Sequence, residues 1–171
     1  HPCETQCRLG QLDDAVSIRD IRRFLAAYGA DHPDEVIAEK TAGQRPEKFA
    51  IIGSGPAGLA AASELARHGC QVTVFEKEEM PGGLLRYGIG PHRLPRNILD
   101  AELKYIEDLG VRFITSHPVN LEEVDALKKD FDSVILSTGS WKDRNLGAPG
   151  EDLEGVEGCL SFLNRFYRGE V

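Results

Sequence analysis

The feature that most constrains this sequence is a glycine-rich segment, residues 53–58 (Gly-Ser-Gly-Pro-Ala-Gly), which lies between an apolar stretch and a helical pattern. The apolar residues 49–52 predict a buried strand, and the small and apolar residues from about Pro56 to His68 predict a helix. Residues 72–75, rich in β-branched side chains, predict a second strand. This order of strand, turn, helix and strand predicts a right-handed βαβ unit with parallel strands.

Each glycine of the segment has its own expected role. Gly53 permits the tight turn after the strand, Gly55 lets the backbone approach a pyrophosphate, and Gly58 lets the helix pack closely on the strand. The helix N-terminus offers free N–H groups and partial positive charge to an anion. Glycine-rich turns are often only turns, but here Glu76 ends the second strand, where a carboxylate can accept hydrogen bonds from ribose hydroxyls. The constellation predicts a dinucleotide site, and an incidental surface acid is the alternative for Glu76.

Beyond this unit the pattern alternates again between helix and strand. We expect a helix from Arg96 to Leu109, a strand at 111–114, a short helix capped by Asn120 and a buried strand at 133–137. Strands that alternate with helices predict an α/β fold built on a Rossmann-like, doubly wound parallel sheet. The side chains expected to face inward from the first of these helices are Ile98, Leu99, Leu103 and Ile106.

The glycine fingerprint does not by itself distinguish NAD from FAD, but the adjacent glycines Gly82 and Gly83 favour FAD. Two consecutive glycines expose backbone amides to an extended ligand, as a flavin dinucleotide requires past the first turn. A plain loop after Pro81 is the alternative. Ser137, Thr138 and Gly139 end the last expected strand, and these small residues can return the backbone toward the cofactor.

The residues before the sheet are expected to form a separate module. Within residues 1–29, Ser17 fits a helix N-cap, and the apolar residues that follow it recur at helical spacing. Residues 30–47 are polar and punctuated by glycine and proline, which is typical of a linker. We therefore expect a short N-terminal helical segment, a linker, and a dinucleotide-binding domain over residues 48–171.

The composition limits which binding partners and which cellular compartment we expect for this chain. A formal net charge of −8 at pH 7 disfavours a nucleic-acid partner, which would need clustered Lys and Arg. The sequence contains no apolar run long enough to cross a bilayer and no signal-peptide pattern at its start. The 4 cysteines lack the density of a disulfide scaffold, so we expect a reducing, cytoplasmic environment in which thiols are free or bind metal.

Three further segments carry a family resemblance: Gly82 to Ile89, Arg93 to Pro95, and Leu146 to Asp152. They resemble the FAD-dependent pyridine-nucleotide disulfide oxidoreductase superfamily, and within it the glutamate synthase small-subunit-like proteins. Similar segments occur in the NADPH-binding part of dihydropyrimidine dehydrogenase, in the ferredoxin-NADP transhydrogenase large subunit and in adrenodoxin reductase. One departure is Gly90, where the group often has proline.

The resemblance implies an FAD site. The glycine-rich turn would hold the pyrophosphate and Glu76 the adenosine ribose, Val119 would lie beside the adenine, and Arg93 would lie near the flavin. The implied cofactor-binding residues are Gly53, Ser54, Gly55, Pro56, Ala57, Gly58, Glu76, Lys77, Gly82, Gly83, Leu84, Arg93, Val119, Thr138 and Gly139.

Cys3 and Cys7 are the candidate metal ligands. Their spacing alone favours two ordinary free thiols, because C-x-x-x-C is a weak metal signal. In the resembled group, however, this segment belongs to a domain that ligates 4Fe–4S clusters, so the resemblance implies a partial cluster site. Two thiolates do not suffice for a cubane with four ligands.

These observations leave three functional hypotheses. The first is a flavoprotein fragment that binds FAD, from a larger enzyme that transfers electrons between NAD(P)H and iron–sulfur clusters. The group places its NAD(P)H domain after the first FAD segment, and no second G-x-G-x-x-G follows Gly139. The second is a cofactor-holding or subunit-docking module without turnover, and the third, more remote, is an NAD-dependent dehydrogenase domain.

We expect no acid–base dyad or nucleophile, because the flavin carries the chemistry. The expected partners are a nicotinamide cofactor and iron–sulfur electron carriers or a partner subunit.

Overall fold

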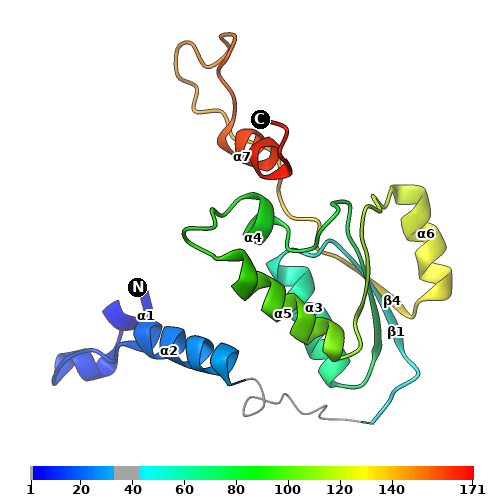
Figure 1. Cartoon of the computed structure of the whole chain (residues 1–171), viewed down its shortest axis with the longest axis horizontal. Helices are drawn as coiled ribbons and strands as arrows, with labels where there is room; N and C mark the ends of the chain where they lie inside the picture. Colours follow the sequence, from blue (N-terminus) through cyan, green and yellow to red (C-terminus); the bar gives the residue numbers. More distant parts are fainter. Residues whose placement is uncertain (1, 33–42) are drawn as a thin grey trace. The chain divides into compact units, whose positions relative to one another are not determined.

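The computed structural model describes residues 2–32 and 43–171. The chain divides into two compact units, His1–Ala38 and Glu39–Val171, each of which is described by itself (Figure 1). The described part of the expected linker, 43–47, carries no helix and no strand. Residues 33–42 of that linker lie outside the described residues.

The first unit is helical. The expected helix is present as α2, which begins at Ile18 directly after Ser17 and continues to Asp31. Ser17 occupies the N-cap position, but its side chain makes no capping hydrogen bond. The carboxylate of Glu4 instead accepts a hydrogen bond from the backbone N–H of Arg19 at 3.1 Å. Two short elements precede α2: the helix α1 (Pro2–Thr5) and the 3₁₀ turn η1 (Arg8–Gln11).

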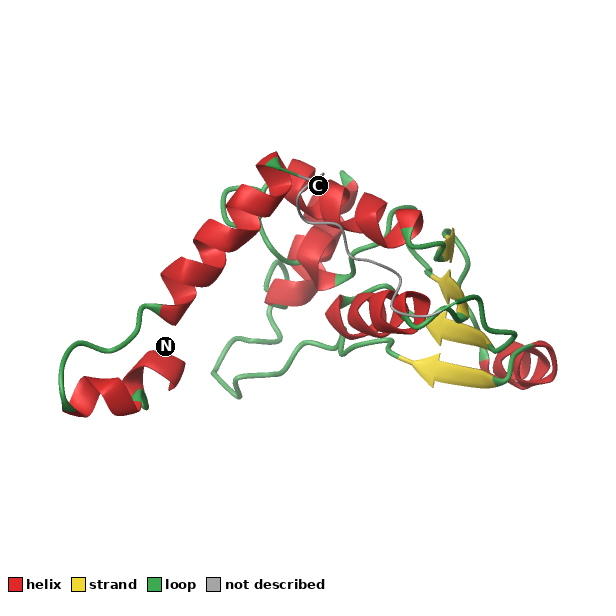
Figure 2. Cartoon of the chain, turned by 90° about the horizontal axis from the view of Figure 1, so that it is seen from below, coloured by secondary structure: helices red, strands yellow, loops and turns green. Residues whose placement is uncertain are grey.

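The second unit is built on a four-stranded parallel sheet (Figure 2). Its strands lie in the order β3-β2-β1-β4, and Ile52 of the central strand β1 pairs with Phe75 of β2 and Leu136 of β4. This order places β2 and β3 on one side of β1 and β4 on the other, as in Rossmann folds. The strands are β1 (Lys48–Ile52), β2 (Gln71–Phe75), β3 (Arg112–Ile114) and β4 (Ser133–Leu136).

Helices cover both faces of the sheet, which confirms the doubly wound α/β fold (Figure 1). On one face α3 (Pro56–Arg67) packs against β1 and β2, with α5 (Arg96–Asp108) beside it. On the other face α6 (Leu121–Asp130) begins at the expected cap, where the Asn120 side chain accepts a hydrogen bond from the N–H of Glu123 at 2.9 Å. The remaining helices are α4 (Leu84–Tyr87) and α7 (Cys159–Arg168), neither of which was predicted.

The core has a layer on each side of β1. Ala50 and Ile52 form a buried cluster with Phe75 and with Leu127 of α6. Ile51, which alternates with them, is completely buried on the side of α3. Burial on both faces explains why β1 is a continuous apolar run rather than an alternating one.

Two expectations about burial were wrong. Ile98 of α5 is 40% exposed, because Leu99, Leu103 and Ile106 occupy the stripe that faces the protein and Ile98 lies beside it. The strand at 133–137 is not buried throughout: it ends at Leu136, which is 66% exposed. Within the described residues β4 is an edge strand, so one side of it has no neighbouring strand.

Candidate functional site

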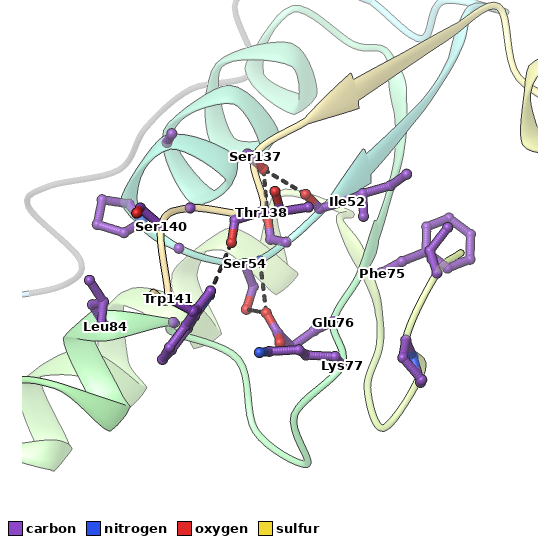
Figure 3. Close-up of a pocket in the computed structure, with 18 of the residues that line it drawn as sticks. Ile52, Ser54, Phe75, Glu76, Lys77, Leu84, Ser137, Thr138, Ser140 and Trp141 are labelled. Carbon is purple, nitrogen blue, oxygen red and sulfur yellow. Dashed lines mark hydrogen bonds between the residues drawn. The ribbon is translucent and has the colours of Figure 1, made fainter. Parts of the chain in front are cut away.

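A cavity of about 350 Å³ lies at the carboxyl ends of the parallel strands. Residues that follow or end β1, β2 and β4 contribute to its wall, including Ile52, Phe75 and Ser137 (Figure 3). The strand order reverses between β1 and β4, so the cavity lies at the topological switch point of the sheet. Open α/β sheets bind their ligands at this position.

The glycine-rich turn has the geometry that each of its glycines was expected to supply. Gly53 has a φ of +100°, and a Cβ there would lie 2.5 Å from the carbonyl oxygen of Ser137. A Cβ on Gly58 would lie 2.0 Å from the carbonyl oxygen of Gly53, so α3 needs glycine at this contact. No atom lies within 4 Å of a Cβ built on Gly55, which lines the cavity. The turn therefore leaves its free space at Gly55, where a ligand can approach the backbone.

Ser137 holds this turn from the neighbouring strand. Its hydroxyl lies 2.8 Å from the carbonyl oxygen of Gly53 and 3.0 Å from that of Ile52, and it can donate to either. Its backbone N–H also donates to the Ile52 carbonyl at 2.8 Å. These bonds satisfy carbonyl groups at the point where β1 ends and the turn begins.

The side chain of Glu76 is buried, with 3% exposure, and lies against the turn. Its Oε2 accepts hydrogen bonds from the backbone N–H of Ser54, at 2.9 Å, and from the Ser54 hydroxyl (Figure 3). Its Oε1 accepts one from the N–H of Glu78 at 2.9 Å. The Ser54 hydroxyl in turn accepts a hydrogen bond from the N–H of Gly82 at 3.0 Å. Glu76 is therefore not a surface acid: it lines the cavity and ties the turn to the loop after β2.

The glycine pair after β2 packs against the first glycine turn. Gly83, at the N-cap of α4, has a φ of +53°, and a Cβ there would lie 2.8 Å from the Cα of Gly55. This close approach needs glycine at position 83. It extends the cavity wall from the first turn to Leu84 at the start of α4.

The opposite end of the cavity is formed by the loop between β3 and α6, residues 117–119. The backbone N–H of His117 donates to the carbonyl oxygen of Glu76 at 2.8 Å, which fixes this loop to the end of β2. The His117 ring packs near Phe75 and hydrogen-bonds with Glu123. Val119 is partly buried against the α6-side core.

Lys77 and Trp141 lie together at the cavity. The Lys77 ammonium lies 4.4 Å from the centroid of the indole ring, within cation–π range. The indole Nε1–H donates to the carbonyl oxygen of Thr138 at 3.0 Å. Trp141 could not be assigned from the sequence, because its contact with Lys77 depends on how β2 and β4 are placed in the folded sheet.

The structure brings most of the predicted cofactor-binding residues together around this cavity. All of them line it except Gly58, which packs α3 on the turn, Gly82, which binds Ser54, and Arg93, which is exposed on the loop before α5. The lining residues outside the predicted cofactor-binding set are Ile52, Phe75, His117, Pro118, Ser137, Ser140 and Trp141. Ile52 and Phe75 could have been found from their positions at strand ends beside a switch point.

Cys3 and Cys7 do not form a metal site in the described part of the chain. Cys3 is exposed and Cys7 partly exposed, and the described residues contain no group of three or more His, Cys, Asp and Glu placed to hold a metal ion. A 4Fe–4S cluster needs four ligands, so this residue set does not fit one. Backbone hydrogen bonds at Val16, and then at Leu9 and Gly10, lower the pKa of the Cys7 thiol.

Among the described helices, none is long and apolar enough to span a membrane.

The comparisons with known proteins agree with this geometry. Residues 51–120 match the family of NAD(P)-binding Rossmann-like domains. The glutamate synthase [NADPH] small chain of Bacillus subtilis is 40% identical over 95% of this chain and 33% of its own length. The NADPH-Fe(3+) oxidoreductase subunit beta of Geobacter sulfurreducens is 36% identical over 99% of this chain and 26% of its own length.

Among solved structures, Mycobacterium tuberculosis FprA in complex with NADPH has a TM-score of 0.62 and 32% identity, over 71% of this chain and 29% of that protein. The chain thus spans about a third or less of the length of these three proteins. It is similar to these oxidoreductase subunits over that part of their length, and the match to NAD(P)-binding Rossmann-like domains covers its residues 51–120.

Proposed function

We propose that this segment binds FAD in the cavity at the switch point, as part of a protein that transfers electrons between NAD(P)H and iron–sulfur carriers. The observation that carries the proposal is the open backbone at Gly55, which faces the cavity at the start of α3. The free N–H groups of a helix N-terminus attract a pyrophosphate there. Gly83 and Leu84 continue the wall from this turn, which suits a ligand that extends beyond a single nucleotide.

Glu76 favours a ligand with unmodified ribose hydroxyls. A carboxylate at the end of the second strand accepts hydrogen bonds from ribose hydroxyls, whereas a 2′-phosphate would meet like charge. Oε1 of Glu76 carries a single protein hydrogen bond, so it has a lone pair available for a hydroxyl. FAD and NAD both meet this requirement, and NADPH does not. We therefore propose that NADPH, which the names of the relatives contain, binds to another part of the larger protein.

The chain's own contribution is to bind and orient the cofactor. FAD, when bound, supplies the exchange between hydride transfer and single-electron transfer. The glycine turn would hold the pyrophosphate, Glu76 the adenosine ribose, and Val119 the adenine, while Gly83 and Leu84 would direct the ligand toward the flavin end. Arg93, outside the cavity lining, remains a proposed contact on the flavin side.

The proposal extends to the partners and the compartment. Relatives named as small chains and beta subunits support an electron-carrier or subunit partner for the larger protein. Any iron–sulfur cluster would need ligands beyond Cys3 and Cys7. The 4 cysteines are free in the structure, which supports the cytoplasm as the compartment.

A second candidate is NAD bound in the same cavity, which the matched family of NAD(P)-binding domains favours. Calorimetric titration of the purified chain with FAD, FMN, NAD and NADPH separates the two. The proposal predicts that FAD binds most tightly and that FMN, which has no adenosine, binds at least tenfold more weakly. Tighter binding of NAD than of FAD would support the second candidate, and preference for NADPH would contradict both.

A further inference from the structure

The side chains of Lys77 and Trp141 meet at the cavity, although the two residues follow different strands. Lys77 follows Glu76 at the end of β2, and Trp141 lies four residues beyond Ser137, on the segment that leaves β4. The Lys77 ammonium lies 4.4 Å from the indole centroid, and both side chains line the cavity. The bond from the indole N–H to the Thr138 carbonyl oxygen fixes one edge of the ring (Figure 3).

Lys77 is the one permanently cationic side chain among the described residues that line the cavity. Among the residues that the structure describes, its one close ion pair is with Glu78, at 3.5 Å, and the Glu78 carboxylate also binds Arg168. Glu78 therefore keeps a cationic partner if the ammonium of Lys77 turns away. The Lys77 side chain is 44% exposed, so its flexible stem is free to move.

A cation at this place would favour binding of a dinucleotide's diphosphate. The first position of α3 is Pro56, which has no N–H to donate, so the helix N-terminus offers fewer donors to a pyrophosphate than other residues would allow. The carboxylate of Glu76 adds negative charge to the wall. A side-chain cation at this wall compensates for both effects.

We propose that Lys77 and Trp141 form a diphosphate-responsive latch: the indole holds the ammonium in the free protein, and the diphosphate of a bound dinucleotide draws it away. This inference rests on the proposed dinucleotide site and names a residue pair that controls it. Lys77 contacts the ligand's diphosphate, and Trp141 is a positioning residue that acts through Lys77.

The chain contains a single tryptophan, so its fluorescence reports on this pair directly. Inorganic pyrophosphate is the first probe, because it has no ring to stack on the indole. Titrated at constant ionic strength, with sodium chloride as the control salt, it should shift the emission of the wild-type chain toward that of free Lys77→Met. The Lys77→Met chain itself should show no shift. An unchanged wild-type spectrum at saturating pyrophosphate, with binding verified by calorimetry, would overturn the latch.

Affinity gives a second, independent readout. Lys77→Met should weaken pyrophosphate and FAD binding by about 5- to 30-fold, as expected for a lost charge-assisted contact, and Lys77→Arg should retain binding within about threefold. Lys104→Met is the matched control, since Lys104 is an exposed lysine of α5 that also pairs with an acid. Its binding should equal that of the wild type.

Trp141→Leu separates the latch from direct contact with the ligand. Without the indole no cation–π contact has to break, so this variant should bind pyrophosphate as tightly as the wild type or more tightly. A loss of more than about threefold in Trp141→Leu, or wild-type affinity in Lys77→Met, would overturn the inference while leaving the proposed function intact. Failure of the wild-type chain to bind either FAD or pyrophosphate would overturn both.

Discussion

Ser54 and Glu76 are joined by two hydrogen bonds across a sequence separation of 22: the backbone N–H and the hydroxyl of Ser54 both donate to the same carboxylate oxygen. Both residues are buried, and Ser54 has no exposed surface. The acid at the end of β2 therefore shapes the glycine turn in addition to facing the cavity. Its negative charge helps to fix the conformation in which Gly55 is open.

Replacing Ser54 with alanine should destabilise the fold. The change removes the hydroxyl that donates to Glu76 and accepts from the N–H of Gly82, which leaves two buried polar groups short of a partner. We expect a loss of roughly 1–3 kcal/mol in the free energy of unfolding, measured by urea denaturation. Ser133→Ala, at the exposed start of β4, is the control. A loss at Ser54 no larger than in this control would contradict the network.

Replacing Glu76 with glutamine should weaken FAD binding. The substitution keeps the length but removes the charge, and its amide group cannot accept from every donor that now binds the carboxylate. A lost charge-assisted bond of roughly 1–3 kcal/mol corresponds to about a tenfold to hundredfold loss in FAD affinity.

FMN provides the control for this variant, because it lacks the adenosine that Glu76 is proposed to contact. Titrating both flavins into wild type and Glu76→Gln should show a loss that falls mainly on FAD. An equal loss for the two flavins would indicate a disturbed turn rather than a lost ribose contact. No loss for FAD would remove Glu76 from the proposed binding residues.

Two glycines of the same turn should respond in opposite ways to an added side chain. Gly55 has an ordinary extended backbone and open space around its Cβ position, so Gly55→Ala should fold normally and lose FAD affinity. Gly58→Ala would place a Cβ 2.0 Å from the Gly53 carbonyl oxygen, so it should be destabilised by about 1–3 kcal/mol. Thermal unfolding and FAD titration of both variants test the contrast, which fails if Gly55→Ala retains full affinity.

Tyr87 should ionise at higher pH than an exposed tyrosine. Burial raises its pKa above the usual value of 10.0, and the nearby negative charge of Glu78 adds to the effect. The neutral phenol stabilises the fold fully below that usual value, and the stabilisation is lost as the pH rises through the raised pKa. Ultraviolet titration should show the ionisation with the raised pKa in the wild type and not in the Tyr87→Phe variant. Ionisation of Tyr87 at the usual value of 10.0 would contradict this.

The sequence predicted those features of the fold that depend on local pattern. The C-terminal ends of β1, β2 and β3, the start of α3 at Pro56 and the cap at Asn120 follow from apolar runs and capping chemistry within a few residues. The inward position of Ile98 was wrong because periodicity alone does not define the edges of a buried stripe. The short helix α4 was missed because its four residues follow a glycine pair that is typical of a loop.

The residues of the candidate site could largely be predicted from the sequence, but the contacts between them could not. The fingerprint glycines and Glu76 could be named because their spacing reflects one βαβ unit. The bonds from Ser137 to the turn join β4 and β1, which are neighbours only in the folded sheet. The contact between Lys77 and Trp141 joins segments that follow β2 and β4, two strands with β1 between them. Sequence spacing carries no information about such contacts, so they emerge only from the topology.

The most direct test of the account is a crystal structure of the chain with FAD. The account predicts density for the pyrophosphate beside the backbone at Gly55, the adenosine ribose within hydrogen-bond distance of Glu76, and the flavin beyond Gly83 and Leu84. FAD bound in the reverse orientation, or outside the cavity at the ends of β1 and β4, would contradict it.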